Sequence, residues 1–130
     1  MFGEKFLVEE EWLIKLWIDD CRPAPDGYVW CKSVSKAKSV IAKLEYKNQK
    51  EQEEFWGLRP EPELLEVIDI DYDAGEYAKY GGDYIKLLDW LEATGRNYPI
   101  RIHSMNTVGV ENMRRIIRKN GWVEIKEVWK

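Results

Sequence analysis

Short apolar segments alternate with amphipathic segments along most of this chain, and that order limits the folds open to it. The apolar runs at residues 13–18, 28–32, 64–70 and 99–102 have the length and composition of buried strands. The second, third and fourth runs are each followed by apolar residues at helical spacing. Alternating strands and helices are typical of a mostly parallel sheet with helices packed on its faces.

Three helices and a last strand complete the predicted order. The helices begin near residues 33, 84 and 106 and end near residues 50, 94 and 120. Ser33 or Ser35 caps the first helix, and Asn106 or Thr107 caps the third. A fifth strand is predicted at residues 122–129, where polar and apolar residues alternate. We therefore predict one α/β domain over residues 1–130, with three layers around a five-stranded, mostly parallel sheet.

The first connection departs from this pattern because it is short. About nine residues separate the first two strands, fewer than the dozen or so that a parallel crossover normally takes. Either a helix has been reduced to a loop at this point, or the first two strands are antiparallel. The core is expected to run from about residue 13 to residue 129.

Charge and cysteine content limit the functions open to the chain. The net charge of −4 argues against a broad nucleic-acid-binding face, which needs clustered cations. Cys21 and Cys31 fit neither a disulfide framework nor a CxxC metal pair, so we expect reduced thiols in a cytoplasmic protein. The acidic N-terminus has no long apolar run, and neither a signal peptide nor a membrane span is expected.

Chemically reactive side chains follow three of the predicted strands. They are Asp19 and Asp20 after the first strand, Asp71 and Asp73 after the third, and His103 and Ser104 after the fourth. In open parallel sheets, ligands bind beyond the carboxyl ends of the strands. Clustered carboxylates repel one another unless a cation joins them. The four aspartates therefore predict a site for Mg²⁺, or for Mn²⁺ given the nearby histidine. The alternative is that these acids only cap turns.

The segment that begins at His103 opens the third helix, and helix N-termini attract phosphate groups. The imidazole of His103 could donate a proton to a leaving alkoxide or take one from water. Ser104, Asn106 and the amides near Gly109 could hold phosphoryl oxygens. The alternative is that His103 only forms structural hydrogen bonds and that Ser104 only caps the helix.

Basic side chains near this edge have two interpretations. Arg22 could form a bidentate contact with a phosphate, or it could pair with Asp19 or Asp20. The basic residues at 114–119 on the last helix are typical of a solvated surface, although they could also guide an anionic substrate.

These motifs together resemble the receiver superfamily, in which Asp71 would occupy the phosphoacceptor position and Asp19 and Asp20 the metal-binding pair. The closer resemblance is to its divergent branch of cyclic-phosphate processing receiver-like domains. That resemblance rests on LWIDDCRPAP at 16–25, IDYD at 70–73, GD at 82–83 and HSMNTVGVENM at 103–113. It spans about residues 13–122 and implies a flavodoxin-like fold with a degenerate first crossover.

The resemblance implies a metal-assisted phosphoesterase that acts on a cyclic phosphate, either a 2′,3′-cyclic phosphate at an RNA end or a related nucleotide derivative. The catalytic residues would be His103, Asp71 and Ser104, and the substrate-binding residues Arg22, Asn106, Gly109 and Asn112. A non-catalytic module that binds a nucleotide or a protein is the first alternative. A phosphoaccepting receiver is the second, although no lysine has a clear place at the end of the last strand.

Overall fold

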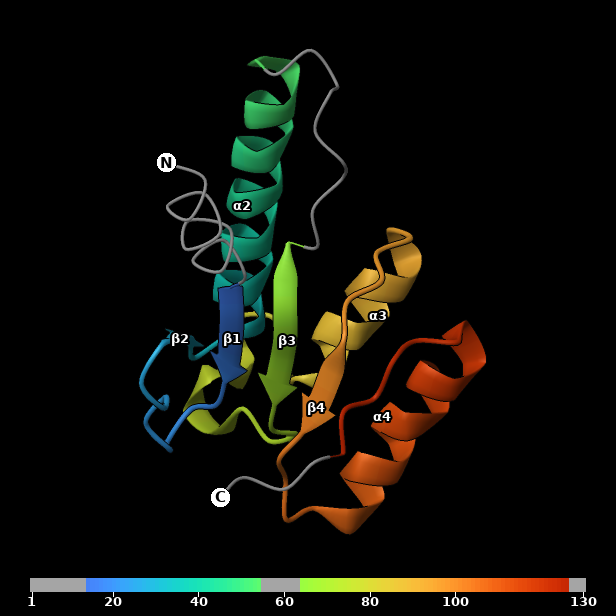
Figure 1. Ribbon diagram of the computed structural model, residues 1–130. Coiled ribbons are helices and arrows are strands. Elements are labelled where there is room, and N and C mark those ends of the chain that lie inside the picture. Colours follow the sequence, from blue (N-terminus) through green and yellow to red (C-terminus); the bar gives the residue numbers. More distant parts are fainter. Residues whose placement is uncertain (1–13, 55–63, 127–130) are drawn as a thin grey trace.

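The computed structural model describes residues 14–54 and 64–126. Its strands are β1 (Ile14–Ile18), β2 (Tyr28–Cys31), β3 (Leu65–Ile70) and β4 (Ile100–Ile102), and its helices are α2 (Val34–Glu54), the 3₁₀ helix η1 (Gly75–Lys79), α3 (Ile85–Ala93) and α4 (Thr107–Asn120). The strands form one sheet in the order β2-β1-β3-β4, and every pair is parallel (Figure 1). The predicted α/β class and parallel sheet are confirmed.

The first two strands are parallel although no helix connects them within the described chain. The loop that replaces the helix is held by its own hydrogen bonds. The indole Nε1 of Trp17 donates to the carbonyl of Arg22 at 2.8 Å, and the amide of Tyr28 donates to the carbonyl of Pro25 at 3.1 Å. These contacts let about nine residues make the crossover that normally takes a helix.

One face of the sheet forms the hydrophobic core. Leu16, Ile18, Ile68, Ile70 and Ile100 are fully buried, and they alternate with residues that point to the opposite face, as strand geometry requires. All three α-helices contribute to the same core: Val34, Ala37 and Ile41 from α2, Leu87, Leu88 and Leu91 from α3, and Met113 and Ile117 from α4.

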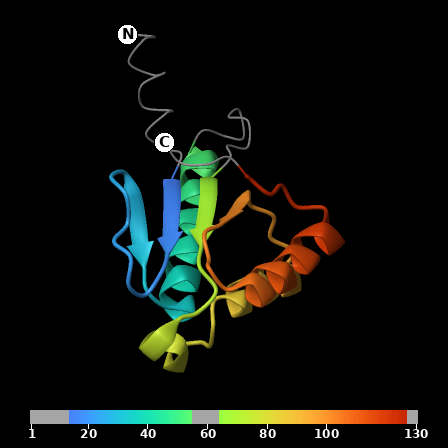
Figure 2. The same cartoon turned by 90° about the horizontal axis from the view of Figure 1, so that it is seen from below.

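The described helices therefore pack on one face of the sheet (Figures 1 and 2). Within residues 14–54 and 64–126 the architecture has two layers, and no described helix covers the opposite face. The prediction of three layers is not reproduced in this part of the chain. This follows from the first crossover, because the connection that would place a helix on the second face is a loop.

The prediction of a fifth strand is wrong, because the described sheet has four strands. Residues 122–126 contribute a single parallel bridge between Glu124 and Ile100. Strand β4 has three residues, and among the described residues only its Ile100 bonds to this segment, to Val123 at 3.0 Å and to Ile125 at 2.8 Å. The remainder of the predicted strand, residues 127–129, lies outside the described residues.

The helix boundaries follow their predicted signals. Ser33 Oγ accepts the amide of Lys36 at 3.0 Å at the start of α2. Asn106 caps α4 by accepting the amide of Gly109 at 2.9 Å, and Gly121 ends it with a left-handed φ of 67°. No described helix is long and apolar enough to cross a membrane. Cys21 and Cys31 are free thiols, the first exposed and the second buried.

Candidate functional site

Three aspartates meet at the carboxyl ends of β1 and β3. Asp19, Asp20 and Asp71 each offer one carboxylate oxygen, and these oxygens all lie within 4.8 Å of one another. We call these three residues the carboxylate cluster. Asp19 is buried, whereas Asp20 and Asp71 are half-buried. This spacing would let one small divalent cation contact an oxygen from each residue.

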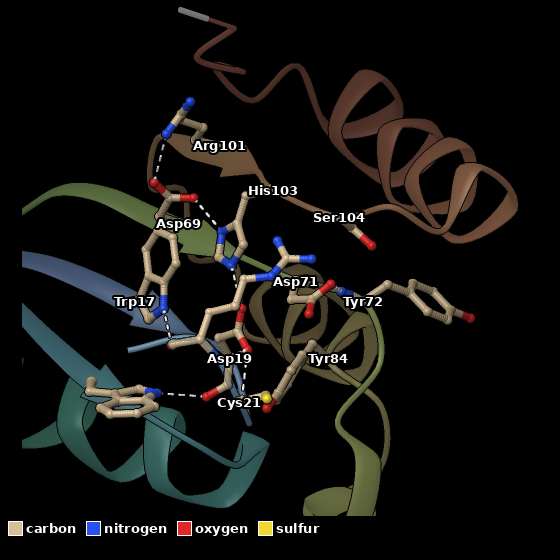
Figure 3. A network of polar contacts seen from close by, with 12 residues as sticks. Trp17, Asp19, Cys21, Asp69, Asp71, Tyr72, Tyr84, Arg101, His103 and Ser104 are labelled. Atoms are coloured by element: carbon tan, nitrogen blue, oxygen red, sulfur yellow. Dashed lines mark hydrogen bonds and ion pairs between the residues drawn. The ribbon is translucent and has the colours of Figure 1, made fainter. Parts of the chain in front are cut away.

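The sheet fixes the backbone beneath this site. Each strand-end residue donates its amide to the last residue of the neighbouring strand: Asp19 to Cys31 at 3.3 Å, Asp71 to Ile18 at 2.9 Å and His103 to Ile70 at 2.9 Å. The parallel ladders thus continue one residue beyond the strands, and they bring three chain segments to one edge (Figure 3).

Asp19 is held in its ionised form by hydrogen bonds. Its Oδ1 accepts the backbone amides of Cys21 at 2.9 Å and of Arg22 at 3.0 Å. Burial alone would raise the pKa of Asp19, but these two amides and the contact with His103 outweigh burial and lower the pKa. The tight turn after β1 therefore creates a buried negative charge.

Asp20 is in the opposite electrostatic situation. Burial and the negative charges of Asp19 and Asp71 raise the pKa of its carboxyl. No lysine or arginine of the described chain pairs with Asp20 or Asp71. Gly75 at the start of η1 lies so close that a Cβ added there would be 2.4 Å from Asp20 Oδ2. The cluster thus has excess negative charge, which a divalent cation would neutralise.

The only histidine bridges two carboxylates. His103 Nε2 lies 2.9 Å from Asp19 Oδ2, and its Nδ1 lies 2.6 Å from Asp69 Oδ1 (Figure 3). The imidazole stacks on the indole of Trp17, with ring centroids 3.8 Å apart and an angle of 6° between the planes. The side chain of His103 is 10% exposed. Its ring is therefore fixed in position and orientation.

The two contacts of the His103 ring with carboxylates require hydrogen-bond donors. Ionised carboxylates only accept hydrogen bonds, so two ionised partners need a donor at both ring nitrogens. Since Asp19 is held ionised and its pKa is lowered, Nε2 of His103 is the donor in the contact with Asp19. The bridge therefore places a transferable proton directly beside the carboxylate cluster.

Sequence reasoning missed Asp69 and Arg101. Asp69 is fully buried within β3, and its Oδ2 accepts Nη1 of Arg101 at 3.1 Å. The register aligns Trp17 with Asp69 and Asp69 with Arg101, so the three share one row on the face opposite the core. The available signal was an acid between two isoleucines in the second half of the strand, two residues before Asp71.

Two other predicted residues lie at the edge of the site. Asp73 is exposed and does not join the carboxylate cluster. Its Oδ2 is 3.4 Å from Nδ2 of Asn106. Ser104 is half-buried, and its Oγ accepts the amide of Asn106 at 3.2 Å.

Of the remaining predicted residues, Gly109 and Asn112 have structural partners, whereas Arg22 lies exposed. The amide of Gly109 is occupied by the cap, and the ring of Tyr72 packs directly on Gly109, where a Cβ would be 2.4 Å from Tyr72 Cγ. Asn112 accepts Nη1 of Arg115 at 3.2 Å. Arg22 is exposed, and its guanidinium forms no ion pair with the aspartates of the cluster.

The basic residues of the last helix pair with acids. The contacts are Arg114 to Glu124 at 2.8 Å, Arg118 to Glu111 at 3.1 Å and Lys119 to Glu92 at 3.4 Å. These pairs support the interpretation of this run as a solvated surface.

Comparison with known proteins connects this geometry to a family. Neither curated proteins nor solved structures give a significant match. The sequence profile of the family described as Cyclic-phosphate processing Receiver domain matches residues 14–119. The matched range includes the carboxylate cluster, Asp69 and His103, and it covers most of the 130 residues. The chain therefore belongs to the family of cyclic-phosphate processing receiver domains.

Proposed function

We propose that this protein is a metal-assisted phosphoesterase that opens a cyclic phosphate on an RNA end or on a nucleotide. The observation that carries the proposal is the bridge from Asp69 through His103 to Asp19. It joins an oriented, largely covered imidazole to a carboxylate cluster in which no lysine or arginine of the described residues pairs with Asp20 or Asp71. The family description supports the choice of a cyclic phosphate as substrate.

The cluster fits a hard divalent cation such as Mg²⁺ or Mn²⁺. Asp19, Asp20 and Asp71 would hold the ion, since one oxygen of each lies within reach of a single small cation and no lysine or arginine of the described chain pairs with Asp20 or Asp71. When bound, such an ion would polarise the phosphoryl group and offset charge that develops in the transition state. Asp73, which the sequence also suggested, would remain outside this ligand set.

His103 would handle the proton. Asp69 would keep Nδ1 engaged, as the buried acid does in other acid–histidine pairs. Nε2 would then exchange its contact with Asp19 for one with the substrate. As the P–O bond of the cyclic ester breaks, Nε2 would protonate the departing ribose oxygen. Water would supply the new P–O bond, and the proton that water loses would return to the pair formed by Asp19 and His103.

Helix α4 would hold the non-bridging oxygens of the phosphate. The first amides of a helix have no partner within the helix, and Asn106 occupies the amide of Gly109. The amides of Thr107 and Val108 therefore suit this role better than that of Gly109. Ser104 and Arg22 would add a hydroxyl and a guanidinium from either side of the site.

The test is ³¹P NMR of the full chain with Mg²⁺ and a panel of 2′,3′-cyclic and 3′,5′-cyclic nucleotides. We expect opening of a 2′,3′-cyclic ester, and the product isomer identifies the oxygen that leaves. Asp71→Ala and His103→Ala should each lower the rate by at least 100-fold. If both variants kept the full rate, the mechanism would be wrong.

One observation favours a second function, a non-catalytic module that binds a nucleotide. Both ring nitrogens of His103 already contact carboxylates, and the side chain is 10% exposed. A ring held in this way could serve only to orient Asp19. Tight binding of a nucleotide without turnover, with either metal present, would support this second function.

A further inference from the structure

A cavity of about 360 Å³ lies between β2, the N-terminus of α2 and η1. Its walls are Trp30, Lys32, Ser33, Lys36, Tyr77 and Tyr80. The volume falls at the lower end of the range for small-molecule sites, which is about 300–1,000 Å³. None of the roles proposed above uses these six residues.

Hydrogen bonds and packing connect this cavity to the carboxylate cluster. The indole Nε1 of Trp30 donates to the carbonyl of Asp19 at 2.7 Å. On the other wall, η1 begins at Gly75, directly against the carboxylate of Asp20. The amide of Ser35 donates to the carbonyl of Tyr80 at 3.1 Å, and this bond joins η1 to the start of α2. Elements that line the cavity therefore also contact residues of the carboxylate cluster.

The chemistry of the walls is aromatic and cationic. Three of the six residues carry rings, two are lysines and none is acidic. The ammonium of Lys32 lies 4.6 Å from the ring centroid of Trp30 and 5.9 Å from that of Tyr77. Ser33 occupies the cap of a 21-residue helix, whose N-terminus adds positive potential. In a chain of net charge −4, the chemistry of these walls suits an anion attached to a flat ring.

We infer that the cavity receives the base of the nucleotide whose cyclic phosphate is held at the cluster, with the 5′-phosphate of the same nucleotide on Lys32 and Lys36. This inference rests on the proposed function for the position of the cyclic phosphate. The base would stack on Tyr77 or Trp30, since aromatic side chains stack on any base. The ammonium of Lys32 would leave the ring faces to pair with the phosphate. In an RNA substrate, the phosphodiester before the terminal nucleotide would take the place of the 5′-phosphate.

The first experiment measures binding alone. The full-length ¹⁵N-labelled protein is titrated in EDTA with adenosine 5′-monophosphate, adenosine or ribose 5-phosphate. We expect the monophosphate to bind more tightly than either fragment and to shift the indole resonance of Trp30 and the amide of Lys36. No binding of the monophosphate, or shifts confined to other regions, would overturn the inference.

Matched variants locate the site. Tyr77→Leu and Lys36→Glu should each weaken binding of the monophosphate by about 5- to 10-fold. Tyr46→Leu and Lys43→Glu alter exposed residues of α2 outside the cavity, and they should leave the affinity for the monophosphate unchanged. Equal affinity in all four variants would overturn the inference. A short oligonucleotide that ends in a 2′,3′-cyclic phosphate, tested beside the mononucleotide, shows which source of phosphate the lysines prefer.

Failure of this inference can be distinguished from failure of the proposed function. The titration needs neither metal nor turnover, so binding at the cavity without hydrolysis would contradict only the phosphoesterase. Hydrolysis that Tyr77→Leu and Lys36→Glu leave unchanged in both KM and kcat would contradict only the cavity.

Discussion

The Nδ1 atom of His103 lies 2.6 Å from Oδ1 of Asp69, and this contact joins the segment after β4 to the interior of β3 behind the carboxylate cluster. Asp69 is fully buried, and a buried acid on one ring nitrogen fixes which way the other nitrogen points. Nε2 consequently faces Asp19 and the cluster. Asp69 is thus a positioning residue for the proposed proton donor.

Asp69→Asn should lower kcat for the cyclic ester by about 10²- to 10⁴-fold, because the amide no longer selects the same protonation state of the imidazole. The acidic limb of the pH–rate profile should move as well, which a purely structural change would not cause. Loss of a buried ionic partner typically costs about 3–5 kcal/mol, so rates are compared at temperatures where urea titrations show both proteins folded. Glu66→Gln, an exposed change in the same strand, is the control. An unchanged kcat and pH profile in Asp69→Asn would contradict this role.

Asp20→Asn should stabilise the metal-free protein and weaken its response to metal. Burial and two neighbouring charges raise the pKa of Asp20. The protonated carboxyl of Asp20 therefore stabilises the folded state below the unfolded pKa, near 3.8. This stabilisation is lost as the pH rises through the higher pKa of the folded state. At pH 7 the charged carboxylate of Asp20 destabilises the folded state, and replacement by asparagine removes this destabilisation. We expect the melting temperature in EDTA to rise by a few degrees at pH 7 but not at pH 3.5. The increase in melting temperature that Mn²⁺ produces should be smaller in Asp20→Asn than in the unmodified protein. A lower melting temperature in EDTA at pH 7 would contradict this account.

Gly109→Ala should destabilise the protein by about 1–3 kcal/mol, because the new methyl group would meet the ring of Tyr72 at 2.4 Å. In an ordinary helix position the same change would stabilise by about 1 kcal/mol. Tyr72→Leu in the same chain should recover most of the loss, and urea unfolding of both single variants and the double variant measures the coupling. If the changes in unfolding free energy of the two single variants simply added in the double variant, the contact with the Tyr72 ring would not be the cause of the destabilisation by Gly109→Ala.

Glu45→Gln should cost about 1 kcal/mol at pH 7 and much less below pH 4.5. Glu45 accepts Nη2 of Arg96 at 2.7 Å and also the hydroxyl of Tyr98. Burial opposes ionisation, but these contacts outweigh it and lower the pKa of Glu45 from 4.5. The stabilisation is therefore present above pH 4.5 and disappears as the pH falls through the folded value. Urea titrations at pH 7 and pH 3.5 measure it, with Glu66→Gln as an exposed control. If Glu45→Gln lowered the free energy of unfolding by the same amount at pH 3.5 as at pH 7, the stabilising role of the ionised Glu45 would be contradicted.

The sequence predicted the strand ends well because each strand stops at a clear change of chemistry. The apolar runs before Asp19, Asp71 and His103 ended where the structure ends β1, β3 and β4 within one residue. The parallel sheet then brought Asp19, Asp20 and Asp71 together as predicted. Asp73 did not join them because β3 ends at Ile70. In the loop beyond it, side chains no longer point to alternating sides as they do along a strand.

What the sequence did not predict depends on register or on packing partners. The pairing of Asp69 with His103 and Arg101 requires knowing that β3 and β4 are neighbours aligned at those positions. The predicted fifth strand did not form in the described residues because β4 has three residues and only Ile100 offers hydrogen bonds to residues 123–125.

The most direct test of the proposed phosphoesterase is the ³¹P NMR signal of a 2′,3′-cyclic nucleotide incubated with the pure protein in EDTA and again after Mg²⁺ or Mn²⁺ is added. We predict that the cyclic ester persists in EDTA and is converted to a single monoester once metal is present. Asp20→Asn should convert it far more slowly at the same metal concentration. Conversion at equal rates with and without metal would contradict the role of the carboxylate cluster, and no conversion under any condition would contradict the phosphoesterase itself.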